Sequence, residues 1–166
     1  MDEPFMRSKV LQYKDTVYKI AYTYCKNTAD AEDTFQEVFL RYFKNTSKFT
    51  NDEHEKAWLI RVTINCCKKL LGSSWFRKTI QLDENISFDE KEESEIFYAV
   101  MALPQKYRTV VHLYYYEDYS VREIAEIISI KETTVQTQLQ RAREMLKSKF
   151  KEEYEDGQRY IQKSIQ

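Results

Sequence analysis

Apolar and polar residues follow one another along the chain with the spacing of amphipathic helices. Apolar residues recur every three or four positions, which places them on one face of a helix. The segments with this spacing cover roughly residues 5–25, 29–44, 53–71, 95–103, 105–116, 120–128 and 133–150. The pattern therefore predicts an all-α chain.

These segments fall into two groups, separated by a stretch without helical periodicity. Gly72 ends the first group, and residues 73–94 carry no apolar repeat. Long unstructured connections are uncommon inside one compact domain. We therefore expect two small helical domains, of three helices over 1–72 and four helices over 95–150, joined by a flexible linker. Residues 151–166 have little pattern, and we expect them to form a frayed tail.

Pro104 separates the first two helices of the second group, because proline lacks the amide hydrogen that a helix interior needs. The helix before it is expected to turn Ile96, Val100 and Leu103 inward. Proline also suits the first turn of a helix, so the next helix should follow directly. Its expected inward residues are Tyr107, Val110, Val111, Tyr114 and Tyr115.

The last two helical segments carry the start signals of a helix-turn-helix. Ser120 and Glu123 have the spacing of a capping box, in which each side chain accepts a hydrogen bond from the other residue's backbone N–H. Thr133 and Gln136 have the same spacing. Two short capped helices joined by residues 129–132 are typical of a helix-turn-helix.

The last helix has a polar face opposite its apolar stripe, and this face is poor in acids. Hydroxyl, amide and guanidinium groups are those that bind base edges and phosphates in a major groove. The candidate residues are Thr134, Gln136, Thr137, Gln138, Gln140, Arg141 and Arg143. From Lys131 to Lys149 there are five Lys or Arg against two Glu, which favours nucleic-acid binding over a helical hairpin with a merely solvated face.

The predicted helix over 29–44 has a charged outer face. Acidic residues occupy its first turns and basic residues its last turns, an order that suits the helix dipole. The same acids would equally serve as a docking surface for a basic partner. The residues alone leave both interpretations open.

The predicted helix over 53–71 carries a basic face without acids. Arg61, Asn65 and Lys68 recur on this face at steps of four and three, with Lys69 beside them. Such a face suits contacts with DNA backbone and bases, and a solvated helix face explains the spacing equally well. The whole-chain net charge of −1 gives no argument for nucleic acid, but charge is segregated. Six basic residues and no acidic ones lie from Lys56 to Lys78. The stretch from 79 to 95 has seven acidic residues and one Lys, so the linker is acidic.

Composition and motifs argue against an enzyme. Only two Gly and two Pro disfavour turn-rich β folds. His54 and His112 are isolated and lack metal-ligand spacing, no Gly-rich phosphate loop is present, and no Ser, His and acid arrangement stands out. We expect no metal, no cofactor and no small-molecule substrate.

The three cysteines, Cys25, Cys66 and Cys67, argue against a disulfide framework in a chain without an export signal. Cys66 and Cys67 are expected to be packing residues, with a redox switch as the alternative. No apolar run is long enough to span a bilayer, so a soluble, cytoplasmic protein is expected.

Three motifs, taken together, resemble the extracytoplasmic-function sigma factors of bacterial RNA polymerase. Residues 30–41, DAEDTFQEVFLR, resemble the helix that binds core polymerase in that family. Residues 57–65, AWLIRVTIN, resemble the segment that melts and reads the downstream promoter hexamer. Residues 103–143, with Leu103-Pro104, the Ser120 helix, Thr133-Thr134-Val135 and Arg141-Ala142-Arg143, resemble the domain that reads the upstream hexamer. The resemblance covers roughly residues 8–150, in the family's order.

The resemblance implies partners and residue roles. The helix over 29–44 would dock on the basic coiled coil of the largest polymerase subunit, with Asp30, Glu32, Asp33, Gln36, Glu37 and Arg41 as candidate contacts. Asn65 would hold an unstacked base of the melted strand, with Arg61, Lys68 and Lys69 on the backbone. The partners implied are core RNA polymerase, promoter DNA and an anti-sigma factor, commonly membrane-bound, that occludes both domains.

The sequence departs from the family pattern at the helix-turn-helix. Ser129 stands where many members have Gly, so a slightly strained turn is expected. Gln136 and Gln138 stand where many family members have Lys or Arg. The preference for a DNA sequence is therefore expected to depend more on amide and hydroxyl groups. Two other functions remain as alternatives: a free-standing helix-turn-helix regulator that binds duplex DNA tightly without polymerase, and a helical adaptor with no DNA role.

Overall fold

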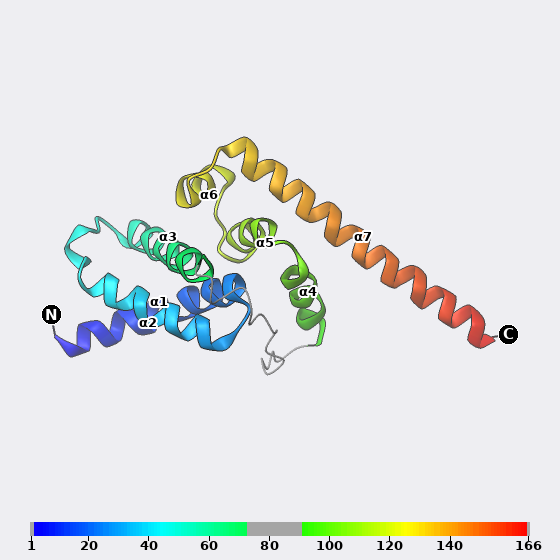
Figure 1. Cartoon of the computed structure of the whole chain (residues 1–166), viewed down its shortest axis with the longest axis horizontal. Helices are drawn as coiled ribbons and strands as arrows, with labels where there is room; N and C mark the ends of the chain where they lie inside the picture. Colours follow the sequence, from blue (N-terminus) through cyan, green and yellow to red (C-terminus); the bar gives the residue numbers. More distant parts are fainter. Residues whose placement is uncertain (1, 73–90, 166) are drawn as a thin grey trace.

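The computed structural model describes residues 2–72 and 91–165, and every regular element in those ranges is helical (Figure 1). The first unit contains α1 (Glu3–Cys25), α2 (Thr28–Phe43), the short 3-10 turn η1 (Thr46–Lys48) and α3 (Asp52–Leu71). The second unit contains α4 (Lys91–Ala102), α5 (Gln105–Val111), the π-helical segment η3 (His112–Tyr116), α6 (Val121–Ile128) and α7 (Glu132–Ile165). The all-α prediction is confirmed.

Side-chain caps start the helices of the first unit and α6 of the second. The Asn27 side chain accepts from the backbone N–H of Asp30, and that of Asn51 accepts from His54, both at 2.8 Å. At α6 the predicted capping box is present: Glu123 donates its N–H to Ser120 Oγ at 3.2 Å, and Ser120 donates its N–H to Glu123 Oε2 at 2.8 Å. These caps satisfy amides that a helix's own first turn leaves unbonded.

The expectation of a second capping box, formed by Thr133 and Gln136, is wrong. Helix α7 begins at Glu132, so Thr133 already lies inside its first turn. The backbone carbonyl of Lys131 accepts the N–H groups of Thr134 and Val135 at 3.0 and 3.1 Å. A residue inside the helix cannot cap it, and Thr133 is therefore an ordinary first-turn residue.

Two residues expected in the core are exposed. Ile96 on α4 is 51% exposed, and its neighbour Phe97 is half-buried against the core instead. Tyr115 is 52% exposed because the segment from His112 to Tyr116 is π-helical. A π turn holds more residues than an α turn, so the spacing of an α-helix no longer predicts which residues face inward.

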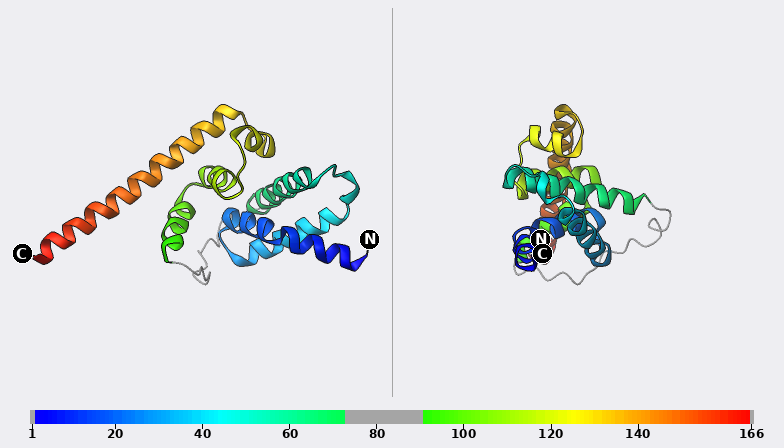
Figure 2. Two further views of the ribbon diagram at one scale, coloured as in Figure 1. Left: turned by 180° about the vertical axis from the view of Figure 1, so that it is seen from behind. Right: turned by 90° about the vertical axis from the view of Figure 1, so that its left-hand side faces the viewer.

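The expectation of a frayed C-terminal tail is also wrong. Helix α7 continues to Ile165 and projects away from the other helices (Figures 1 and 2). The stretch is rich in Glu, Lys and Gln, which are good helix formers, and Lys151 Nζ lies 3.9 Å from Glu155 Oε1 one turn later. Most of the predicted linker lies outside the described residues. Where the description resumes, Lys91 is already helical, four residues before the expected start of α4 at 95.

A buried carboxylate holds the first unit together. Glu55 of α3 is 5% exposed and accepts from the Tyr13 hydroxyl at 2.6 Å and from Lys9 Nζ at 2.8 Å. The Tyr42 hydroxyl also donates to it. Because these donors come from α1 and α2, one side chain links all three helices. Around it lies an apolar cluster of Tyr13, Val17, Val38, Phe39, Tyr42, Leu59 and Cys66.

A second and larger cluster is shared by the two units. It joins Ile20 and Tyr24 of α1 and Ile64 of α3 to residues of α5, η3, α6 and α7. Among the latter are Val110, Leu113, Ile124, Ile127 and Leu139. The C-terminal end of α1 packs on α5, and α3 packs on α6. The two units thus have a common core in this structure.

Candidate functional site

The outer face of α2 presents acids to solvent. Glu32, Asp33 and Gln36 are exposed, and their side chains have no polar partner among the described residues. Asp30 is half-buried, and its backbone N–H and side chain both bond Asn27, the N-cap of α2. The six predicted contact residues therefore lie on one helix but differ in availability.

The other two predicted residues of this face pair with each other. Arg41 Nε lies 2.6 Å from Glu37 Oε1, one turn away, and both side chains are nearly half exposed. The carboxylate of Glu37 raises the pKa of Arg41. An exposed pair of this kind contributes little to stability, so it remains open to exchange for an external partner.

Leu40 is a residue of this face that the sequence did not single out. It lies one turn beyond Gln36 and is 60% exposed, although α2 buries its other large apolar side chains wholly or partly. Single exposed apolar residues are common on protein surfaces, so its exposure alone does not mark a binding site. The sequence gives little indication that Leu40 is exposed, because it directly follows the inward-facing Phe39 and could be counted with the apolar stripe.

The basic face of α3 is exposed, as predicted. Asn65, Lys68 and Lys69 are exposed, and the described residues provide no hydrogen-bond partner for the Asn65 amide. Arg61 is engaged within the molecule. Its Nε donates to the Ile127 carbonyl at 3.3 Å and its Nη2 to the Glu126 carbonyl at 3.2 Å. One residue of the predicted DNA-contact group is thus hydrogen-bonded to the last turn of α6.

The polar face of α7 follows the prediction closely. Its seven candidate residues are exposed except Gln138, which is half-buried. The Thr137 hydroxyl donates to the Thr133 carbonyl at 2.9 Å, and Gln140 Nε2 donates to Glu144 Oε1 at 3.3 Å. These are weak, local interactions on an exposed surface, so the groups can exchange them for a ligand.

The two arginines of this face contact tyrosines of α5 and η3. Arg143 Nε donates to the Tyr115 hydroxyl at 2.7 Å, and its guanidinium lies 5.6 Å from the ring centroid of Tyr114. Arg141 bonds the Tyr107 hydroxyl and lowers the pKa of that tyrosine. The exposure of Tyr115 follows from the π turn, and this hydroxyl orients an arginine of the predicted recognition helix.

A cleft of about 150 Å³ lies where the faces of α3 and α7 approach each other. Lys68 of α3 and Gln138 of α7 both line it. Its other lining residues are Tyr24, Ile64, Gln105, Lys106, Thr109, Ile128 and Ile130. The structure therefore brings members of the two predicted DNA-contact groups to one cleft between the units.

The turn between α6 and α7 has the strain that the sequence indicated. Ser129 adopts φ 57° and ψ 49°, a left-handed conformation, and its N–H donates to the Ala125 carbonyl. Glycine adopts this conformation without the clash of a Cβ atom. The turn keeps the geometry of a left-handed helix end despite the serine.

The cysteines are buried packing residues. Cys25, Cys66 and Cys67 are at most 7% exposed and form no disulfide. Burial raises the pKa of Cys66, and a hydrogen bond with Cys25 together with burial raises that of Cys67. A protonated, buried thiol such as that of Cys66 or Cys67 is a poor nucleophile. The hydrogen bond with Cys67 lowers the pKa of Cys25, but Cys25 is only 2% exposed.

The described part of the chain shows neither a membrane span nor a metal site. None of its helices combines the length and the apolar run that crossing a bilayer requires. Within the same residues, no group of three or more His, Cys, Asp or Glu is placed to hold a metal ion.

Comparisons with known proteins match both units. The family model for sigma-70 region 2 matches residues 10–77, and that for sigma-70 region 4 matches residues 94–146. RNA polymerase sigma factor SigV of Bacillus subtilis (strain 168) is 28% identical over 152 residues, covering 87% of this chain and 90% of the relative. The ECF RNA polymerase sigma factor SigW of the same strain is 28% identical over 160 residues, covering 84% and 86%.

Two solved structures have the same arrangement of helices. The sigma factor RpoE of Bartonella quintana, in complex with the anti-sigma factor NepR, matches with a TM-score of 0.68 and 18% identity, over 87% of this chain and 96% of that chain. CnrH, in complex with the cytosolic domain of CnrY, matches with a TM-score of 0.64 and 19% identity, over 90% of both chains. At these identities the likeness shows the shared fold.

Proposed function

Because this chain belongs to the extracytoplasmic-function sigma factors of RNA polymerase, we propose that its three exposed helix faces divide the work of starting transcription. The protein binds core RNA polymerase and directs promoter recognition and transcription initiation. The observation that carries this function is the pair of sigma-70 regions, matched in order over 10–77 and 94–146. The domains assigned from the sequence, 1–72 and 95–150, then correspond to the first unit and to the promoter-binding part of the second.

The outer face of α2 is the docking surface for core polymerase. Glu32, Asp33 and Gln36 are exposed and free to meet basic side chains of a partner, which favours encounter and orientation. Glu37 and Arg41 can exchange their mutual pair for partner groups. Leu40, exposed between Glu37 and Arg41, adds an apolar contact to this charged surface.

The basic face of α3 binds the melted downstream element. Asn65 is exposed and its amide both donates and accepts, which suits the edge of an unstacked base. Lys68 and Lys69 bind the adjacent phosphates, so salt weakens this contact. Strand opening here requires no ATP, because the free energy of binding extruded bases offsets the lost stacking.

The exposed face of α7 binds the upstream element as duplex. Thr134, Thr137 and Gln138 present hydroxyls and an amide toward base edges. Arg141 and Arg143 provide the ionic contacts, and the tyrosines of α5 and η3 orient them. This face carries few charges, so sequence preference depends mainly on hydroxyl and amide contacts with bases. Gln136 and Gln140 provide further amides for such contacts.

We also propose an anti-sigma factor as a partner and the cytoplasm as the site of action. The solved structure of RpoE contains the anti-sigma factor NepR, and that of CnrH contains the cytosolic domain of CnrY. Sigma factors act together with polymerase and DNA, without catalysis of their own. No cofactor is required for the roles assigned here.

Run-off transcription tests the function. Purified protein is added to genomic fragments with and without bacterial core RNA polymerase. Discrete transcripts that require both components are expected, and their upstream sequences supply the promoter motif. Absence of stimulation, together with tight binding of duplex DNA by the protein alone, would instead favour a free-standing helix-turn-helix regulator. Absence of both would favour a helical adaptor.

A further inference from the structure

The cleft between α3 and α7, called the α3–α7 cleft below, has an apolar part. Ile64 of α3, Ile128 at the end of α6 and Ile130 in the following turn line it. Ile64 is 2% exposed, and the other two are half-buried. The cleft volume of about 150 Å³ is that of an apolar cavity that holds benzene. The cleft therefore has room for one apolar body of this size.

The polar part of the cleft carries positive charge. Lys68 of α3 and Lys106 of α5 line it, and no acidic residue of the described chain does. Gln105 and Gln138 add side-chain amides. The Thr109 hydroxyl is already engaged, because it donates to the Gln105 carbonyl at 2.9 Å. Two cations without an opposing acid favour the binding of an anion.

Both lysines are available to a ligand. Lys68 and Lys106 are exposed, and neither takes part in a salt bridge within the described residues. Lys106 Nζ lies 5.0 Å from the ring centroid of Tyr107 and bonds the hydroxyl of that residue, which Arg141 also bonds. A third cation is thus held close to Lys106, which strengthens the positive potential at this side of the cleft.

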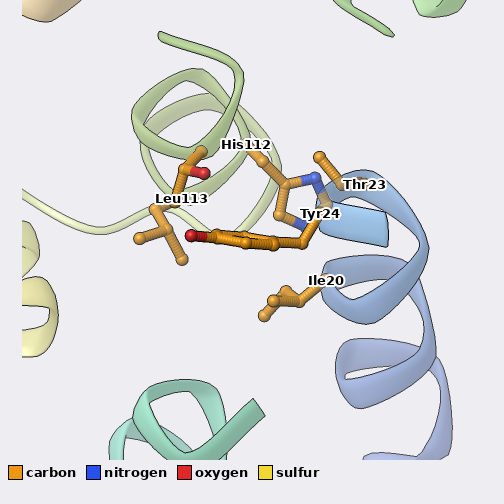
Figure 3. Close-up of a pocket in the computed structure, with 6 residues that line it drawn as sticks. Ile20, Thr23, Tyr24, His112 and Leu113 are labelled. Atoms are coloured by element: carbon orange, nitrogen blue, oxygen red, sulfur yellow. The ribbon is translucent and has the colours of Figure 1, made fainter. Parts of the chain in front are cut away.

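The wall of the cleft at Tyr24 is closed. Tyr24 and Thr109 line the cleft and also a void of only about 10 Å³, which is at the lower limit for one water molecule. Figure 3 shows the Tyr24 ring lying between Leu113 and Ile20 at this void. Burial raises the pKa of Tyr24 to about 12, so its hydroxyl adds no negative charge at neutral pH. A ligand in the cleft therefore extends no further than Tyr24.

We propose that the α3–α7 cleft binds a small organic anion. The apolar body of the ligand lies against Ile64, Ile128 and Ile130, and its burial provides most of the affinity. The anionic group lies between Lys68 and Lys106, which orient the ligand and select against neutral molecules. An apolar lining with a few placed polar groups is typical of small-molecule sites. This cleft is smaller than the sites of drug-sized ligands, so the ligand is little larger than one ring with one anionic group.

The site has a consequence for transcription. Lys68 and Gln138 line the cleft and also belong to the two proposed DNA faces. A bound anion occupies these groups, so the ligand and promoter DNA compete for them. Activity then responds directly to a small acid. This competition rests on the function proposed above, whereas binding of the anion to the free chain does not.

Phenyl phosphate is the probe for the site, used with the full-length chain. Inorganic phosphate lacks the apolar body, and benzyl alcohol lacks the charge. Isothermal titration calorimetry measures each affinity, and phenyl phosphate is expected to bind about tenfold or more tightly than either control. Isoleucine-methyl NMR locates the ligand: the methyl signals of Ile64, Ile128 and Ile130 should shift, whereas that of the exposed Ile96 on α4 should not.

Two variants test the two parts of the cleft. Lys106 belongs to no proposed DNA or polymerase surface, and Lys106→Gln should weaken phenyl phosphate binding about 3–10-fold while leaving benzyl alcohol binding unchanged. Thr109→Leu adds apolar bulk within the cleft and should weaken the binding of both. The Thr109 hydroxyl bonds only its own helix, so this variant should fold, which circular dichroism verifies. Lys14→Gln, on the exposed side of α1, is the control for the loss of charge.

The outcomes separate the ligand site from the proposed function. Isoleucine methyl signals that do not shift with phenyl phosphate would overturn the site. Equal affinities for phenyl phosphate and inorganic phosphate, or equal effects of Lys106→Gln and Lys14→Gln, would also overturn it. If phenyl phosphate binds as expected but saturating amounts leave run-off transcription unchanged, the competition with DNA is wrong and the site stands. If the chain supports no transcription even without phenyl phosphate, the proposed function is wrong.

Discussion

The guanidinium of Arg108 donates to the backbone carbonyl of Thr23 at 2.6 Å, which joins α5 to the end of α1. Its other nitrogens donate to the carbonyls of Tyr24, Met101 and Leu103 at 3.0–3.3 Å. Arg108 is 4% exposed, and burial lowers its pKa to about 10, so it remains charged at neutral pH. One cation thus satisfies carbonyls at the C-terminal ends of two helices, one in each unit.

Replacement of Arg108 should destabilise the protein strongly. Arg108→Met removes four hydrogen bonds and leaves buried carbonyls without donors, so the free energy of unfolding should fall by about 2–4 kcal/mol. Arg108→Lys should also be destabilising, because one ammonium cannot reproduce the fork of the guanidinium. Urea unfolding measures the loss, with the exposed Arg122→Met as control. A loss below about 0.5 kcal/mol would mean that water satisfies these carbonyls.

Glu55 should make stability depend on pH. Burial raises its pKa, but hydrogen bonds from Lys9, Tyr13 and Tyr42 outweigh burial, so the folded-state pKa lies below the ordinary value. A depressed pKa contributes stability that is fully present above the unfolded-state pKa and is lost as pH falls through the folded-state value. Unfolding experiments at pH 7 and at about pH 4 and below should show this loss. Glu55→Gln should weaken the dependence, whereas the exposed Glu53→Gln should keep it.

Asp33→Lys should abolish association with core polymerase while the fold remains intact. The side chain is exposed and without an internal partner, so its reversal affects only an external contact. Co-purification with core enzyme measures association, and circular dichroism the fold. Asp15→Lys, on the exposed side of α1, gives the same change in net charge. Normal co-purification of Asp33→Lys would refute the docking role of α2.

Asn65→Ala should impair strand opening more than recruitment. Loss of a bidentate amide contact to a base costs roughly 1–3 kcal/mol, which corresponds to a decrease in opening of about 5- to 150-fold. Permanganate reactivity of promoter thymines measures opening, and retardation of the promoter by the holoenzyme measures recruitment. Gln12→Ala removes an exposed amide on α1 and serves as control. A variant that opens promoters normally would exclude Asn65 as the base-holding residue.

Ser129→Gly should stabilise the helix-turn-helix. The left-handed conformation at φ 57° strains a serine by about 1–2 kcal/mol, and glycine relieves this strain but adds freedom to the unfolded chain. The net gain should be about 0.5–1 kcal/mol in thermal or urea unfolding. Ser148→Gly, in the interior of α7, should destabilise by a similar amount. Equal effects of both substitutions would indicate that Ser129 is unstrained.

The sequence predicted best what depends on neighbouring residues. The capping box of Ser120 and Glu123 is local, and the structure has it. The strain at Ser129 follows from one backbone position and was also predicted. By contrast, the π turn after His112 changes the helical spacing within a single segment, and Tyr115 therefore turned outward against expectation.

Contacts between distant parts of the chain had no signal in the sequence. Nothing in the residues around Arg108 indicates acceptors 84 and 85 positions away. Arg61 was correctly placed on a polar face of α3. Its partners are backbone carbonyls, which every residue has, so the sequence could not indicate which of them it binds. The assignments of α2, α3 and α7 to polymerase and DNA remain predictions, since they depend on molecules that bind from outside.

The length of α7 has a mechanical consequence. At 1.5 Å per residue, its 34 residues measure about 50 Å, and the helix projects beyond the other helices (Figure 1). Val135, Leu139 and Ala142 anchor its first part in the core, so α7 rotates together with the second unit. A rotation of that unit by about 10° displaces a point about 50 Å along the helix by about 9 Å, so a small movement of the recognition helix is amplified at the far end of α7.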